Sequence, residues 1–185
     1  MCLISPIGVG TCPKKGRAGI NKLWAIPCVS VEDIVFDPVT RKVTAWVIDA
    51  LALQPGFVPI EFEKDTAFFN QAKVKVKNST NVTQTISFVE PQLANETRNA
   101  LEDLASCCCL IVIVRDNANH YHVMGVSYDP VTNTWQAEYA ATGEGSANTG
   151  ADPTADSAEY IETITANTAF YAPHFDGLEA DIPLA

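Results

Sequence analysis

The sequence predicts a mainly β protein, an antiparallel β-sandwich or half-barrel with one packed α-helix and extended N- and C-terminal arms. Three observations indicate this. Residues 67–77 and 82–90 alternate between apolar and polar side chains, as strands with one exposed face do. Residues 95–106 place apolar side chains at helical spacing. Residues 107–114 are a short apolar run rich in β-branched residues, which is typical of a strand buried on both faces.

The other segments follow in order along the chain. Residues 1–19 are rich in Gly and Pro and contain a basic cluster, which predicts a flexible arm. Residues 20–168 are expected to form a single domain. Its further strands are expected at 20–27, 30–36, 42–49, 57–63, 120–128, 134–141 and 160–168. The small-residue segment 142–158 is expected to be a long loop, and residues 169–185 a C-terminal tail.

The predicted helix carries one apolar stripe, which we expect to cover one face of the sheet. Its members are Leu93, Thr97, Ala100, Leu101, Leu104 and Cys108. The sequence Asp-Pro-Val-Thr occurs twice, at 37–40 and 129–132, each time before a Trp-bearing strand. Pro at the second position favours a type I turn, so we expect the same turn at both places.

The first predicted hairpin carries polar side chains that fit a subunit interface. Lys73, Lys75 and Lys77 share one face of its first strand, and Thr83, Thr85 and Ser87 form the polar face of its second. The lysines fit two roles, protection of an edge strand against aggregation or a charged contact with an acidic neighbour.

Cysteines and histidines supply the candidates for chemistry. Cys107–Cys109 are expected to be buried thiols, the alternative being a reactive thiol site. His120 and His122 share a strand face and could bind a metal with His174 or a carboxylate, although we favour a structural role. Since no catalytic or nucleotide-binding motif is found, we expect no enzyme activity and no cofactor. No apolar run approaches the roughly 18 residues of a membrane span, so no membrane partner is expected.

Charge is distributed unevenly along the chain. The formal net charge is −10, and all 12 Lys and Arg lie at or before Arg115. Residues 116–185 therefore hold 11 Asp and Glu and no base, which argues against nucleic-acid binding by this part. It suits an acidic surface or a lumen that DNA does not adhere to. The candidates for this surface are Glu144, Asp152, Asp156, Glu159 and Glu162.

From residue 12 to about residue 170 the chain resembles the tail-tube-like structural proteins of tailed bacteriophages, especially those common in phages of Bacteroides-type hosts. The segments that carry the resemblance are Gly19-Ile-Asn-Lys-Leu-Trp24, Ala67-Phe-Phe-Asn70, Leu110-Ile-Val-Ile-Val-Arg-Asp116, Tyr121-His-Val-Met-Gly125 and Thr142-Gly-Glu-Gly-Ser-Ala147. The chain departs from that pattern at the turn 117–119, where Asn-Gly is expected, and at 158–160, where Gly-Tyr is usual.

The resemblance implies a virion protein that closes into rings with copies of itself, six- or twelve-fold. These would form a tail tube, or a tail or neck ring, through which DNA passes as non-specific cargo. It implies other tail or neck proteins as partners, a place in the virion tail, and assembly in the cytoplasm of the host bacterium. Two alternatives stay open: a soluble β-sandwich binding module of adhesin or carbohydrate-binding type, and a small metal- or thiol-dependent enzyme.

Overall fold

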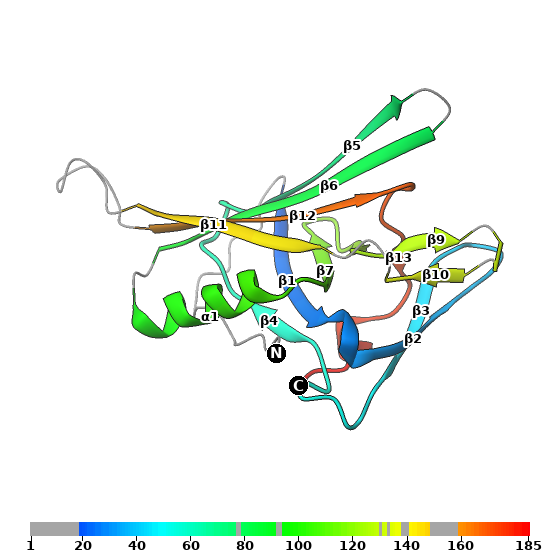
Figure 1. Cartoon of the computed structure of the whole chain (residues 1–185), viewed down its shortest axis with the longest axis horizontal. Coiled ribbons are helices and arrows are strands. Elements are labelled where there is room, and N and C mark those ends of the chain that lie inside the picture. The colour runs from blue at the N-terminus through cyan, green and yellow to red at the C-terminus, as the bar shows by residue number, and fades with distance from the viewer. Residues whose placement is uncertain are drawn as a thin grey trace.

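The computed structural model describes residues 19–76, 79–91, 94–129, 131–132, 134–137, 141–148 and 159–185. The predicted fold class is confirmed, since the chain is mainly β with two principal sheets and one α-helix (Figure 1). The larger sheet has seven strands in the order β2-β3-β13-β8-β7-β1-β4. Their bounds are β1 Ile20–Pro27, β2 Val31–Phe36, β3 Val43–Ile48, β4 Val58–Ile60, β7 Leu110–Asp116, β8 Tyr121–Met124 and β13 His174–Phe175.

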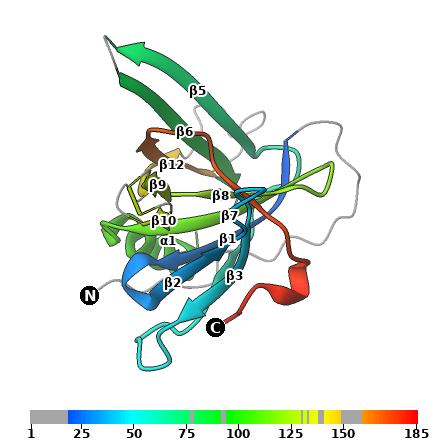
Figure 2. The same cartoon turned by 90° about the vertical axis from the view of Figure 1, so that its right-hand side faces the viewer.

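The smaller sheet has four strands in the order β11-β12-β6-β5. Their bounds are β5 Phe68–Val76, β6 Ser79–Glu90, β11 Thr142–Asn148 and β12 Glu159–Thr168. The far end of the β5–β6 hairpin projects beyond the rest of the chain in two views at right angles (Figures 1 and 2). A third, two-stranded sheet pairs β9 (Ser127–Asp129) with β10 (Thr134–Gln136).

The seven-stranded sheet is buried on both faces, because its central strand β7 is apolar without alternation. Leu110 to Val114 are all buried. Val112 and Val114 join a core shared with the four-stranded sheet and the helix. Ile111 and Ile113 join a second core, on the opposite face, with Trp24, Trp135 and Phe175 among its members. The expected doubly buried strand is confirmed, although it begins at Leu110 rather than at Cys107.

Helix α1 spans Asn95–Ser106, the range predicted from its spacing. Its buried side chains are those of Thr97, Ala100, Leu101 and Leu104. At the end of the stripe, Cys107 is buried and Cys108 is exposed, the reverse of the expectation, because the chain leaves the helix at this point. Leu93, the first member of the predicted stripe, lies outside the described residues.

The segment expected to be a loop after residue 141 contains strand β11, so that prediction is wrong for residues 142–148. Its composition hides the strand, since Gly and Ala have low β propensity. Tertiary contacts explain the glycines. A Cβ on Gly143 would lie 3.7 Å from the Cα of Ala105, so helix α1 lies close against β11 here. The small side chain permits this close packing.

The C-terminal residues differ from the expected tail because they pack against the domain. Strand β13 lies between β3 and β8, parallel to β3 and antiparallel to β8. The last residues run beside β4, where the Phe57 N–H donates to the Pro183 carbonyl over 2.7 Å. The segment therefore completes the seven-stranded sheet. It also introduces parallel pairings into a fold that was expected to be antiparallel.

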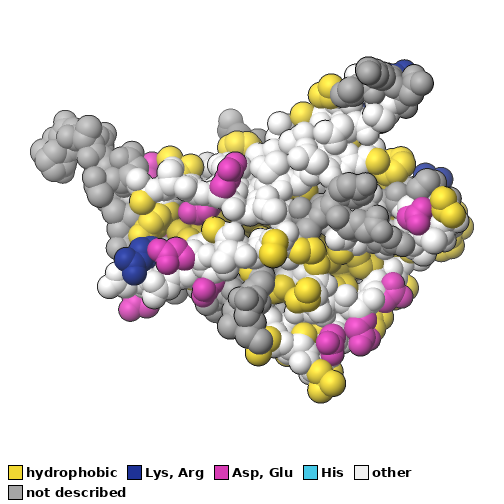
Figure 3. All heavy atoms as spheres, in the orientation of Figure 1, with side chains coloured by type: hydrophobic (Ala, Val, Ile, Leu, Met, Phe, Trp, Pro, Cys, Tyr) yellow, Lys and Arg dark blue, Asp and Glu magenta, His cyan; other side chains and the backbone are white. Residues whose placement is uncertain are grey.

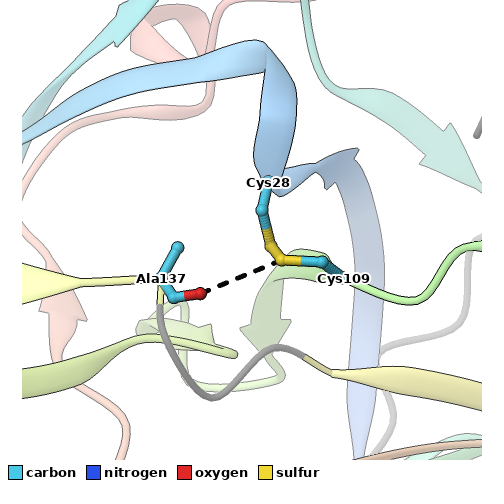
Figure 4. Close-up of a disulfide and its surroundings, with 3 residues drawn as sticks. All are labelled: Cys28, Cys109 and Ala137. Atoms are coloured by element: carbon cyan, nitrogen blue, oxygen red, sulfur yellow. Dashed lines mark hydrogen bonds between the residues drawn. A yellow bond between two sulfur atoms is a disulfide. The ribbon is translucent and has the colours of Figure 1, made fainter.

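The expectation of three buried thiols is wrong. Cys28 and Cys109 form a disulfide with their Cα atoms 5.4 Å apart, which links the 3-10 turn after β1 to the residue before β7 (Figure 4). Cys107 is also disulfide-bonded. Cys108 is free and exposed. Pairs so distant in sequence depend on which strands are neighbours, and spacing alone does not show that.

The two Asp-Pro-Val-Thr segments form the same turn, as predicted. In each, the Asp carboxylate accepts hydrogen bonds from the backbone N–H of the Val and from the Thr hydroxyl, over 2.8–2.9 Å. These bonds are the main reason that the pKa values of Asp37 and Asp129 lie below the ordinary value. The repeat is one local turn used twice, because the hydrogen bonds close within four residues.

Candidate subunit interface

The four-stranded sheet has two free edges in the described chain, strand β5 at one end and strand β11 at the other. All of its neighbouring strands are antiparallel. Strands β5 and β11 therefore run in opposite directions, and β5 of a second copy placed beside β11 would continue the antiparallel pattern. Exposed strand edges carry unpaired backbone N–H and C=O groups that favour pairing with another chain.

One face of this sheet packs on the core, and the opposite face carries many hydroxyl and amide side chains together with the exposed apolar side chains of Phe68, Val74 and Ile161. Its polar members include Asn70, Asn81, Thr83, Thr85, Ser87, Thr142, Ser146, Thr163, Thr165 and Asn167. We call this the hydroxyl face. Alternation along the strands places no described Lys or Arg on it. In Figure 3 the surface over β6 and β12 is mostly white, and dark blue is seen at the hairpin tip and the sides of the molecule.

The lysines of the predicted interface project from the other face of the hairpin. Lys73 is opposite Val82 on the core-facing side of β6, while Thr83 is opposite Ala72 on the hydroxyl face. Both Lys73 and Lys75 are exposed, because the hairpin extends past the core here. The Lys73 ammonium lies 5.3 Å from the centre of the Tyr171 ring. Lys77 lies outside the described residues.

The predicted acidic surface is divided by the structure. Glu144 and Glu159 fall on the hydroxyl face, and Asp152 and Asp156 lie outside the described residues. Glu162 does not belong to an acidic surface, which corrects the prediction. Its position on β12 faces the core, opposite Phe88 of β6, and the residue is only 5% exposed. Burial raises the pKa of its carboxyl group to about 7.

The histidines form a cluster at the other sheet. The Asp116 carboxylate lies 3.2 Å from the His120 ring nitrogen Nδ1 and 3.4 Å from His122 Nε2, and the His122 and His174 rings are 4.6 Å apart. Burial opposes the charged form of Asp116, but these contacts and the backbone N–H of His120 outweigh it and lower the Asp116 pKa. Burial, followed by the neighbouring His122, lowers the pKa of His174.

This cluster joins three strands of the seven-stranded sheet. Within the described part of the chain, no group of three or more His, Cys, Asp or Glu side chains is arranged to hold a metal ion. His174 pairs with His122 across β13 and β8, and Asp116 is the last residue of β7. The arrangement connects the C-terminal strand to the centre of the sheet, as the structural interpretation of these histidines expects.

The three tryptophans are not exposed as a sugar-binding platform would require, although Phe68, Phe170 and Tyr171 are exposed. Trp24 and Trp135 are 3% and 7% exposed, and Trp46 packs against the same core. Carbohydrate sites use exposed aromatic rings, so the tryptophans do not favour that alternative.

Comparisons with known proteins do not assign this chain to a family. Among the described residues, no helix combines the length and hydrophobicity that crossing a membrane requires. No protein-family model, curated protein or solved structure matches this chain.

Proposed function

We propose that this chain is a virion structural protein of a tailed bacteriophage that assembles with copies of itself into a ring. The ring would be part of the tail tube, or of a tail or neck ring, through which DNA passes. The observation that carries the proposal is the four-stranded sheet, with edges at opposite ends that no described strand covers and, between them, a face without described Lys or Arg.

The edges suit a head-to-tail contact. In such a contact, strand β5 of one copy pairs with β11 of the next, and every copy uses both edges. Such heterologous contacts close into a ring when the rotation that relates one copy to the next is a whole-number fraction of 360°. Backbone hydrogen bonds between the edges supply affinity, as in other cases of strand addition.

The sheet is also staggered in the way that a ring of tilted strands requires. The middle of β5, Ala72, is level with Thr83 of β6. The middle of β11 is Gly145, which pairs with Glu162 of β12, and Glu162 pairs in turn with Phe88 of β6. Phe88 lies five residues beyond Thr83 along β6. Closed barrels have tilted strands whose register shifts steadily around the barrel. The offset between the two edges lets copies in one plane pair along most of β11.

The hydroxyl face suits a lumen. DNA is held mainly by cations that neutralise its phosphates, so a surface without Lys or Arg does not retain it. Glu144 and Glu159 add negative charge on this face, which repels the phosphate backbone. A lumen lined by hydroxyl and amide groups would therefore let DNA slide.

Electron microscopy and mass photometry of the purified chain test the proposal. We expect closed rings or short tubes at micromolar concentration. A protein that remains monomeric under these conditions, with no rings or tubes in micrographs, contradicts the proposal.

Reversing the charges of the hairpin is expected to weaken this assembly. The variant K73E/K75E/K77E should need a higher protein concentration to form rings while keeping its melting temperature, because the described lysines are exposed. Raising the salt toward 1 M, where the screening length is about 3 Å, should have a milder effect in the same direction. The matched control K73R/K75R/K77R keeps the charge and should assemble normally. Normal assembly of the glutamate variant would leave the lysines only a role in protecting the edge.

A further inference from the structure

The buried carboxyl group of Glu162 has no partner in the described part of the chain. No hydrogen bond or ion pair to it is found there, and the residue is 5% exposed. Its oxygens are not among the described side-chain atoms that are fully buried without a partner, so solvent still reaches part of the carboxyl group. Burial nevertheless disfavours the charged form of the group. A partner from another molecule would resolve this.

Glu162 lies one strand in from the edge of the sheet. Its neighbour on the edge strand β11 is Gly145. A Cβ placed on Gly145 would lie 2.0 Å from Glu162 Oε1, so the carboxyl group lies directly over this glycine. Any larger residue at this position would collide with the carboxyl group. The glycine therefore leaves Glu162 accessible to a side chain that arrives from beyond β11.

The chain carries a suitable cation at its opposite edge. Lys73 of β5 is opposite Val82 of β6, whose buried side chain faces the same core side as Phe88 and Glu162. A copy that continues the sheet past β11 would therefore bring its own lysines to the face on which Glu162 lies.

We propose that Lys73 of a second copy forms an ion pair with Glu162 across the contact between β5 and β11. This inference rests on the proposed ring and identifies the residues that set its register. Suppose that the middle of β5 lies beside the middle of β11. The residue of β5 that is then opposite Gly145 and points to the core side of the sheet is either Lys73 or Gln71. Neighbouring strands are about 4.8 Å apart, so two inter-strand spacings, about 10 Å, separate the backbones of Lys73 and Glu162, with β11 between them. The extended side chains of a lysine and a glutamate together span this distance.

The same register gives Lys75 a favourable place. In an antiparallel pairing that places Lys73 at Gly145, Lys75 falls at Gly143. Gly143 lies against Leu104 and Ala105, in the last turn of α1. The C-terminal end of a helix carries partial negative charge, and the last turn of α1 contains no basic residue. A lysine from the second copy would offset that charge.

Such an ion pair would decide which register the edges adopt. Backbone pairing is similar in several registers, but a register that places Gln71 at Gly145 leaves the carboxylate without a cation. Paired charges at an interface fix orientation and exclude wrong partners. The buried Glu162 of one copy and the exposed Lys73 of the next would then be two halves of one contact.

Zero-length cross-linking with a carbodiimide tests this pairing on the assembled protein. The reagent joins a lysine amine to a carboxylate in direct contact, and mass spectrometry identifies the linked peptides. We expect a Lys73–Glu162 link between two copies, shown by mixing isotopically labelled and unlabelled protein. The variants E162Q and K73R should lose the link. E144Q, which removes a carboxylate on the other face of β11, should retain it.

Assembly of the same variants gives a second measurement. K73Q should raise the concentration needed for rings about ten-fold or more, since removing one partner of a buried charge pair weakens binding strongly. K73R should assemble normally. If wild-type rings show no Lys73–Glu162 link and K73Q forms rings equally well, the pairing is overturned and the ring proposal still stands. A wild-type chain that forms no rings would overturn both.

Discussion

Replacing Leu101 with Asp is expected to lower the free energy of unfolding by about 4 kcal/mol or more. Leu101 is 4% exposed and belongs to the core between α1 and the two sheets. Removing a buried leucine side chain costs about 2–5 kcal/mol, and burying an unpaired carboxylate adds to that cost. Urea unfolding followed by circular dichroism measures the change.

The matched control is Asn99→Asp, which introduces the same residue at an exposed position of the same helix. Its effect should stay within about 0.5 kcal/mol, as for most surface substitutions. If Leu101→Asp were as stable as the wild type, the packing of α1 against the sheets would not be a source of stability.

Replacing Glu162 with Gln is expected to stabilise the folded monomer at pH 8, by roughly 2–3 kcal/mol. Burial raises the pKa of Glu162 from an ordinary 4.5 to about 7. The folded state therefore keeps its proton at pH values where the unfolded state has lost it. The contribution of Glu162 to stability is then highest below pH 4.5, falls as the pH rises toward 7, and is lowest above 7. The neutral amide avoids this loss.

The experiment compares unfolding at pH 5 and pH 8 in the K73E/K75E/K77E background, which is expected to keep the chain monomeric. The gain from Glu162→Gln should fall below about 1 kcal/mol at pH 5, because most of the pH-dependent loss occurs above that value. Glu144→Gln, on the hydroxyl face, should change little at either pH. An equal gain at both pH values would show that the carboxyl group is not the cause.

The sequence alone was sufficient where local periodicity controls the structure. Residues 95–106 form the predicted helix because an apolar stripe at helical spacing can be buried on one side only. Residues 110–114 form a strand that is buried on both faces because all of their side chains are apolar. The alternation within each strand of the β5–β6 hairpin follows from the two-residue repeat, but only the register of pairing shows that the lysines and the threonines lie on opposite faces.

The same reasoning could assign candidate residues to one face of a strand, but it could not show whether that face is buried or exposed. Glu162 is one of many acidic residues in this part of the chain. Alternation along the strand puts Glu162 and Ile161 on different faces, but it does not show which of these faces is buried. Only the packing of the two sheets makes Glu162 a core residue and leaves Glu144 outside. The glycines of β11 likewise look like loop residues until their contacts with Ala105 and Glu162 are known.

The sequence by itself thus determined the mainly β class, the single helix, the central buried strand and the two equivalent turns. Each of these depends on contacts within about a dozen residues. The tertiary structure alone decided the strand β11, the docking of the C-terminal strand β13, the Cys28–Cys109 disulfide and the burial of Glu162. These features depend on which distant segments become neighbours, since side-chain burial and strand pairing are properties of the packed sheets rather than of any one segment.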